Sequence, residues 1–64
     1  MFMIKENRNK MKLSQEQLAE KINISTRQLQ RIEKAEEKTK LTTLKKIIKV
    51  LEISDEEIID FMKR

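Results

Sequence analysis

The sequence has 64 residues and a formal net charge of +4, and it contains no cysteine, histidine, glycine or proline. A chain of this length folds as one domain, here residues 1–64, with a small core that no disulfide or thiolate metal site stabilises. Without histidine the chain lacks the commonest zinc ligand, and a Ser–His or Cys–His nucleophile is excluded. Because no paired carboxylates accompany a nucleophile or a metal cluster, we expect no enzyme activity, no metal and no cofactor.

The first two helices are predicted from capping residues and apolar periodicity, because the usual helix breakers are absent. Strong helix formers dominate the composition, which favours an all-α fold. A first helix is expected at about residues 2–11. Ser14 and Gln17 then match the capping box Ser-x-x-Gln, which makes Ser14 the N-cap of a second helix that ends near Lys21.

A third helix follows after a very short connection. Asn23 suits the left-handed position that ends a helix. Ser25 is expected to cap the third helix by accepting a hydrogen bond from the backbone N–H of Gln28. The third helix then ends between Lys34 and Glu36.

The last part of the chain is predicted to form a loop and two further helices. Residues 34–40 have no apolar period and are predicted as the loop. A fourth helix covers about residues 42–51, with leucine and isoleucine inward and lysine outward. Ser54 and Glu57 form a second capping box, and the acidic first turn that follows matches the dipole of a fifth helix.

Charge and hydropathy limit the class of partner. Residues 1–32 carry seven basic and three acidic residues, whereas residues 33–64 carry eight of each. A basic field on one side of a small domain indicates an anionic partner or, alternatively, a solvated lysine-rich surface. No apolar run reaches the 7–15 or so residues of a signal peptide or the roughly 20 of a spanning helix, so we expect a cytoplasmic protein without membrane contact.

The pair of short helices joined by a tight turn indicates the function. Such a connection makes the helices cross steeply, so that one can brace against a DNA backbone while the other enters the major groove. The third helix begins Ser-Thr-Arg-Gln, which places polar side chains in the turn that meets base edges. Arginine suits guanine and glutamine suits adenine, so a recognition helix is expected at about residues 25–34.

A set of residues along nearly the whole chain forms a pattern: Arg8, Leu-Ser-Gln-x-x-Leu-Ala at 13–19, Ile24-Ser25, Arg31-Ile32-Glu33, Leu41 with Leu44, and Leu51-Glu52-Ile53-Ser54. With this pattern the chain, over about residues 4–61, resembles the phage-repressor and Cro-like (XRE-like) helix-turn-helix domains. The resemblance implies a compact five-helix lambda-repressor-like fold. It also implies sequence-specific binding of double-stranded DNA. We expect no small-molecule ligand, because no pocket is predicted in so small a core.

The resemblance further implies roles for individual residues. Base contacts are expected from four positions of the third helix: Ser25, Thr26, Arg27 and Arg31. Phosphate contacts are expected from eight polar residues around that helix: Gln15, Gln28, Lys34, Lys38, Lys40, Thr42, Thr43 and Lys45. Arg8 and Glu33 match the family's structural ion pair. The plainer alternative for these residues is a solvated surface and, for Gln15, an ordinary place in the first turn of a helix.

Three positions depart from the family pattern, because many relatives carry glycine where Lys12, Asn23 and Ala35 stand. A left-handed backbone would cost about 1 kcal/mol at Lys12 or at Ala35. We therefore expect the first or third helix to extend past these positions. The path of residues 35–40 is not predicted.

A single domain of this size buries about 600–1,000 Å² on DNA, which favours a homodimer that binds half-sites about 34 Å apart. The dimer candidates are Ile59, Phe61 and Met62 of the fifth helix, with Phe2 nearby, while Ile58 is assigned to the core. The leading hypothesis is a transcriptional regulator, specifically a repressor that binds a palindromic operator. The alternative is a protein-interaction module or antitoxin-like accessory subunit, but the arginine and glutamine side chains of the third helix favour DNA.

Overall fold

The computed structural model describes residues 3–63, and within them every regular element is helical. The elements are α1 (Met3–Lys10), α2 (Gln15–Lys21), α3 (Thr26–Lys34), the short 3₁₀ helix η1 (Glu36–Lys38), α4 (Leu41–Leu51) and α5 (Asp55–Met62). The all-helical prediction is confirmed over this part of the chain. The start of the first helix at Phe2 lies outside the described residues. No described helix is long and apolar enough to cross a membrane.

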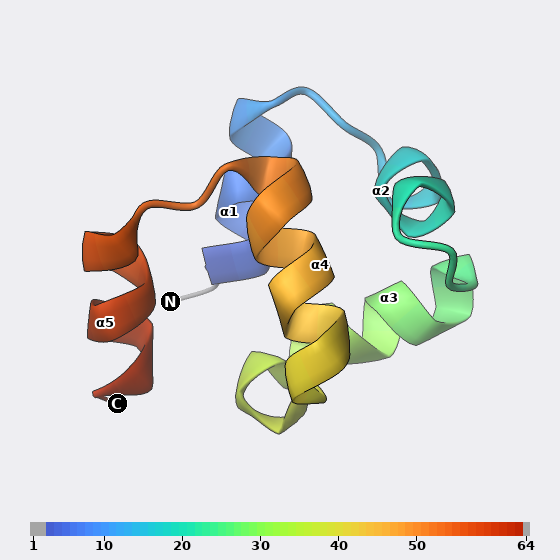
Figure 1. Cartoon of the computed structure of the whole chain (residues 1–64). Coiled ribbons are helices and arrows are strands. Elements are labelled where there is room, and N and C mark those ends of the chain that lie inside the picture. Colours follow the sequence, from blue (N-terminus) through green and yellow to red (C-terminus); the bar gives the residue numbers. More distant parts are fainter. Residues whose placement is uncertain (1–2, 64) are drawn as a thin grey trace.

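The core lies where the first four α-helices meet. Its buried apolar residues are Met3, Ile4, Leu18, Ala19, Ile22, Leu29, Ile47, Leu51 and Ile53. Figure 1 shows α5 on the far side of α1 and α4 from the α2–α3 pair. No described residue of α5 is buried, and this helix reaches the core only through partly buried side chains such as Ile58 and Phe61. The core therefore anchors α2 and α3 more firmly than α5.

Three of the connections repeat one local unit, a left-handed residue followed by an apolar residue and a serine. The units are Lys12-Leu13-Ser14, Asn23-Ile24-Ser25 and Glu52-Ile53-Ser54, with φ values of 58°, 60° and 52° at their first residues. In each unit the N–H of the apolar residue donates to a carbonyl in the last turn of the preceding helix: Leu13 to Arg8 at 3.1 Å, Ile24 to Ala19 at 3.0 Å and Ile53 to Ile48 at 3.1 Å. Each unit thus ends a helix with a Schellman-type bond and returns an apolar side chain to the core.

The serine of each unit begins the next helix. Ser14 Oγ accepts from the N–H of Gln17 at 3.0 Å, and Gln17 Oε1 accepts from the N–H of Ser14 at 2.8 Å, which confirms the predicted capping box. Ser25 and Gln28 form the same reciprocal pair, at 3.1 and 2.9 Å. Each helix of the predicted helix-turn-helix therefore begins with two satisfied backbone N–H donors rather than one.

The capping box predicted at Ser54 is only half formed. Ser54 Oγ accepts from the N–H of Glu57 at 3.2 Å, but the Glu57 carboxylate accepts from the side-chain amide of Asn7 in α1. Asn7 is buried and also donates to the carbonyl of Met3 at 2.7 Å. A buried amide donor needs a partner, so the Glu57 side chain turns toward α1 and ties α5 to it instead of closing its own cap.

The expected extension of helices past the positions where relatives carry glycine is wrong. The first helix ends at Lys10, and Lys12 adopts the left-handed conformation because this lets Leu13 bond to Arg8 and pack against the core. The third helix ends at Lys34, and Ala35 lies at φ −143° and ψ 66°, outside the left-handed region. The predicted loop over residues 34–40 contains η1, because the N–H of Lys38 donates to the carbonyl of Ala35 and that of Thr39 to Glu36.

Candidate nucleic-acid interface

Helix α3 has one face in the core and the other in solvent. Leu29 is fully buried and Ile32 is half-buried, so these two side chains fix the helix against the rest of the molecule. The opposite face exposes four long polar side chains: Arg27, Gln28, Gln30 and Arg31. Thr26, at the start of the helix, is half-buried. The outer face of α3 therefore offers hydrogen-bonding groups to a partner along its full length.

The exposed polar side chains of α3 differ in how they are engaged. The amide oxygen of Gln28 accepts from the N–H of Ser25, and the amide nitrogen of Gln30 donates to Gln15 Oε1 at 3.4 Å. The side chains of Arg27 and Arg31 make no hydrogen bond or ion pair within residues 3–63. Two unpaired guanidinium groups, one helical turn apart, thus remain available to a ligand, whereas the glutamines are partly used within the protein.

The ion pair expected between Arg8 and Glu33 is present and buried. Arg8 Nε donates to Glu33 Oε2 at 2.7 Å, and the two side chains are only 9% and 5% exposed. Arg8 Nη2 donates to Glu33 Oε1 at 3.3 Å, and Nη1 donates to the carbonyl of Leu13 at 2.8 Å. One guanidinium therefore joins α1, the connection before α2, and the C-terminal part of α3. Because both charges are out of water, the pair holds these elements in one arrangement.

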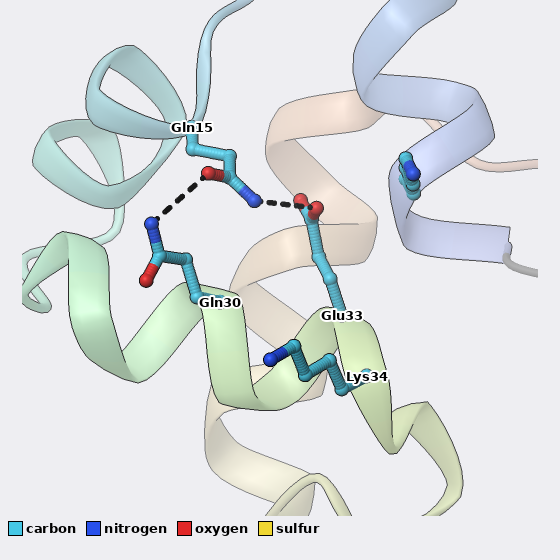
Figure 2. Close-up of a pocket in the computed structure, with 5 residues that line it drawn as sticks. Gln15, Gln30, Glu33 and Lys34 are labelled. Carbon is cyan, nitrogen blue, oxygen red and sulfur yellow. Dashed lines mark hydrogen bonds between the residues drawn. The ribbon is translucent and has the colours of Figure 1, made fainter.

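Gln15, the first residue of α2, continues this network. Its amide nitrogen donates to Glu33 Oε1 at 3.1 Å, and its amide oxygen accepts from Gln30. Figure 2 shows the Gln15 side chain directed toward α3, with Gln30 and Glu33 as its two partners. The contact of Gln15 with phosphate stays a prediction; the structure shows that its amide joins α2 to α3.

An open cleft lies where α1, α2 and α3 meet. Its lining residues are Lys5, Gln15, Gln30, Glu33 and Lys34. Gln15 and Lys34 were expected to contact phosphate, and the cleft brings them together (Figure 2). Lys5 and Gln30 were not expected here. No sequence pattern singles out Lys5, because its place beside α3 depends on how α1 packs.

A second cleft lies on another side of α3, between that helix, residues 38–40 and the start of α4. It is lined by Ile24, Gln28, Arg31, Ile32, Lys38, Thr39, Lys40 and Thr43. Four of the expected phosphate contacts therefore meet beside Arg31. Thr42 and Lys45, also expected as phosphate contacts, are exposed on α4 but line neither cleft.

The remaining candidate residues lie on α5, away from the two clefts. Ile59 is 54% exposed and Met62 is 72% exposed, whereas Phe61 is half-buried and packs against the core. Figure 1 places this helix at the opposite end of the molecule from α2. Within residues 3–63 there is no cluster of three or more acidic residues placed to hold a metal ion.

Comparison with known proteins gives one match, to a family described as Helix-turn-helix, over residues 4–58. Neither a curated protein nor a solved structure matches the chain. The matched range includes α2 to α4, all of α1 except Met3, and every residue that lines the two clefts. It therefore covers the part of the chain that positions the exposed arginines.

Proposed function

Because this chain belongs to the XRE-like helix-turn-helix family of DNA-binding transcription regulators, we propose that α3 is its recognition helix and that the protein is a sequence-specific repressor. The observation that carries this proposal is the placement of α3 between two clefts that each contain lysine side chains, while the side chains of Arg27 and Arg31 remain unpaired. The major groove of B-DNA, about 12 Å wide, accepts one helix and has a phosphate strand on each side. In this geometry α3 would lie in the groove, and each cleft would face one of the two phosphate strands.

The exposed arginines are the proposed base readers. Arginine donates two hydrogen bonds to O6 and N7 of guanine, which is the commonest specific contact in the major groove. Arg27 and Arg31 lie one turn apart on the same helix, so we expect guanines at two nearby base pairs of each half-site. Thr26 and Ser25 contribute contacts at the N-terminal end of α3. The internal hydrogen bonds of Gln28 and Gln30 leave them secondary roles at the edge of the groove.

The clefts are the proposed phosphate sites. Gln15 and Lys34, together with the unpredicted Lys5, would contact one strand. On the other side, Lys38, Lys40 and Thr43 would contact the second strand, joined by Gln28. Thr42 and Lys45 extend this basic surface along α4. Such contacts set the register of the helix in the groove without reading sequence.

The ion pair is proposed to orient the recognition helix. Arg8 and Glu33 hold the C-terminal part of α3, and Gln15 adds a second tie to the same carboxylate. All three groups are linked within the protein, so the angle between α2 and α3 is set before DNA arrives. A pre-set angle lowers the entropy cost of ordering these helices when DNA binds.

We further propose that the regulator acts in the cytoplasm as a homodimer on a palindromic operator. The exposed apolar side chains of α5, Ile59 and Met62, are the proposed contact, with Phe61 behind them. Because α5 lies away from α2 and α3, pairing through it leaves both recognition helices free (Figure 1). Two bound copies covering an operator would exclude other proteins from it, which is repression.

Selection of binding sites from random duplex DNA tests this proposal. We expect a palindrome whose half-sites are centred about one helical turn apart, roughly 34 Å, each containing guanines. A selected site without symmetry would contradict the homodimer but leave DNA reading intact. If no sequence is enriched at low salt, sequence-specific binding by α3 is wrong.

A further inference from the structure

A buried carboxylate outside the ion pair ties the DNA-facing loop to the first helix. Glu36, in η1, is only 3% exposed. Its Oε2 accepts a hydrogen bond from the backbone N–H of Ile4 at 3.1 Å and from that of Lys5 at 3.4 Å. These donors lie in the first turn of α1, where N–H groups have no partner within the helix. A side chain far along the sequence therefore caps α1.

This arrangement has a free-energy cost. Burial raises the pKa of Glu36 above its usual value, although the N–H groups of Ile4 and Lys5 favour the charged form, and the nearby Glu33 raises the pKa further. The other carboxylate oxygen, Oε1, is buried without a partner. An apolar side chain at this position would avoid both costs, but it would leave the N–H groups of Ile4 and Lys5 without their acceptor. The carboxylate is therefore better explained by what it holds in place than by added stability.

What Glu36 connects are the two clefts beside α3. Glu36 accepts a hydrogen bond from the N–H of Lys5, and Lys5 lines the first cleft. Lys38 and Lys40, which follow it in the chain, line the second. The turn between Glu36 and these lysines is tight, because the N–H of Thr39 donates to the carbonyl of Glu36 at 3.1 Å. A displacement of Glu36 from α1 would move the second cleft relative to the first.

We propose that Glu36 is a positioning residue for DNA binding, which sets the span between the two phosphate-contacting clefts by fixing η1 to the start of α1. This inference rests on the proposed function of α3 as the recognition helix. Glu36 does not touch DNA in this arrangement. It acts through Lys5 on one side and through Lys38 and Lys40 on the other.

The test compares four variants for their dependence of DNA affinity on salt. Glu36→Leu fills the buried site but removes the acceptor, whereas Glu36→Asp keeps the charge and shortens the reach. Glu36→Gln keeps an oxygen acceptor for the same N–H groups. The matched control is Glu37→Leu, since Glu37 is exposed in the same turn and its replacement changes the net charge equally.

For a duplex carrying the selected site, we expect Glu36→Leu and Glu36→Asp to reduce the magnitude of the slope of log K against log salt by about two units, one each for the displaced Lys38 and Lys40. Glu36→Gln and Glu37→Leu should retain the slope of the original protein. Circular dichroism checks that each variant is folded, and if Glu36→Leu is not, Glu36→Asp decides. In all four protein variants, the preference for the selected site over DNA sites with a replaced guanine should be unchanged.

If Glu36→Leu and Glu36→Asp have the same slope as Glu37→Leu, the positioning role is overturned. Such a result would leave the proposed function untouched if Arg27→Ala still weakens binding to the selected site. If the original protein itself shows neither a salt-dependent affinity nor an effect of Arg27→Ala, the proposed function fails first, and the inference fails with it.

Discussion

The helix-turn-helix and α5 begin in the same way but are held differently. Helices α2, α3 and α5 each follow a left-handed residue, an apolar residue and a capping serine. The first two then join a buried polar network with Arg8 and Glu33, whereas α5 has no buried residue and is tied to α1 through Glu57. Local chemistry starts all three helices, but tertiary contacts decide which of them are fixed.

That difference matches the roles we propose for the two regions. A helix that reads bases must keep its angle to within a small error, because hydrogen bonds to base edges are short and directional. A helix that forms a contact between copies gains its remaining burial from the partner. We therefore expect substitutions in the network to affect the whole fold and substitutions on α5 to act locally.

The largest effect should follow Arg8→Ala. This change leaves the Glu33 carboxylate buried without its cation, which costs about 3–5 kcal/mol in the free energy of unfolding. Urea denaturation followed by circular dichroism measures this. A loss below about 1 kcal/mol would mean that the ion pair does not hold α3, and the contrast with α5 would disappear.

A smaller and more local effect is expected for Glu57→Ala on α5. The substitution removes the partner of the Asn7 amide, whose nitrogen keeps its bond to Met3, so the loss should be about 1 kcal/mol. Amide hydrogen exchange should show faster exchange in α5 with little change in α2 and α3. Equal acceleration in all three helices would show that α5 is as strongly coupled to the fold as the helix-turn-helix.

Replacing the left-handed residues by glycine should stabilise both regions. Lys12→Gly and Glu52→Gly each remove a steric cost of about 1 kcal/mol, partly offset by the greater freedom of glycine in the unfolded chain. Asn23→Gly should change stability less, because asparagine tolerates this conformation. Thermal unfolding of the three variants measures the ranking. Destabilisation by Lys12→Gly would mean that the left-handed turn before α2 is wrong.

The smallest effect concerns the pH dependence of stability at Glu36. Its pKa in the folded protein is raised above 4.5, so the folded state binds its proton more tightly than the unfolded state does. This contribution to stability is complete below about pH 4.5 and is lost as the pH rises through the folded pKa. Glutamine does not titrate, so the unfolding free energy of Glu36→Gln should rise relative to that of the original chain as the pH increases across that range. A constant difference would contradict the raised pKa.

The parts of this account that sequence alone could predict are those that depend on local chemistry. The starts of α2 and α3 follow from serine and glutamine three residues apart, because a capping box needs only one turn of chain. The Arg8–Glu33 ion pair came from a resemblance rather than from spacing. The candidate base readers of α3 also came from that resemblance; Ser25, Arg27 and Arg31 are exposed, whereas Thr26 is half-buried.

Features that depend on distant contacts could not be predicted. Lys12 adopts a costly conformation because Leu13 gains a place against the core, and this gain is invisible in the local sequence. Glu36 looks like an ordinary surface glutamate in a charged stretch, yet it is buried because α1 supplies two N–H groups. Lys5 joins a cleft only once α1 has packed beside α3.

The central claim is that α3 reads DNA through Arg27 and Arg31, and titration of Arg27→Ala on the selected duplex tests it most directly. Arg27 is exposed and unpaired, so the substitution should leave the unfolding free energy unchanged. Affinity should fall by about 1–3 kcal/mol, and discrimination should relax at one base pair of each half-site. Unchanged affinity and unchanged discrimination would contradict the claim.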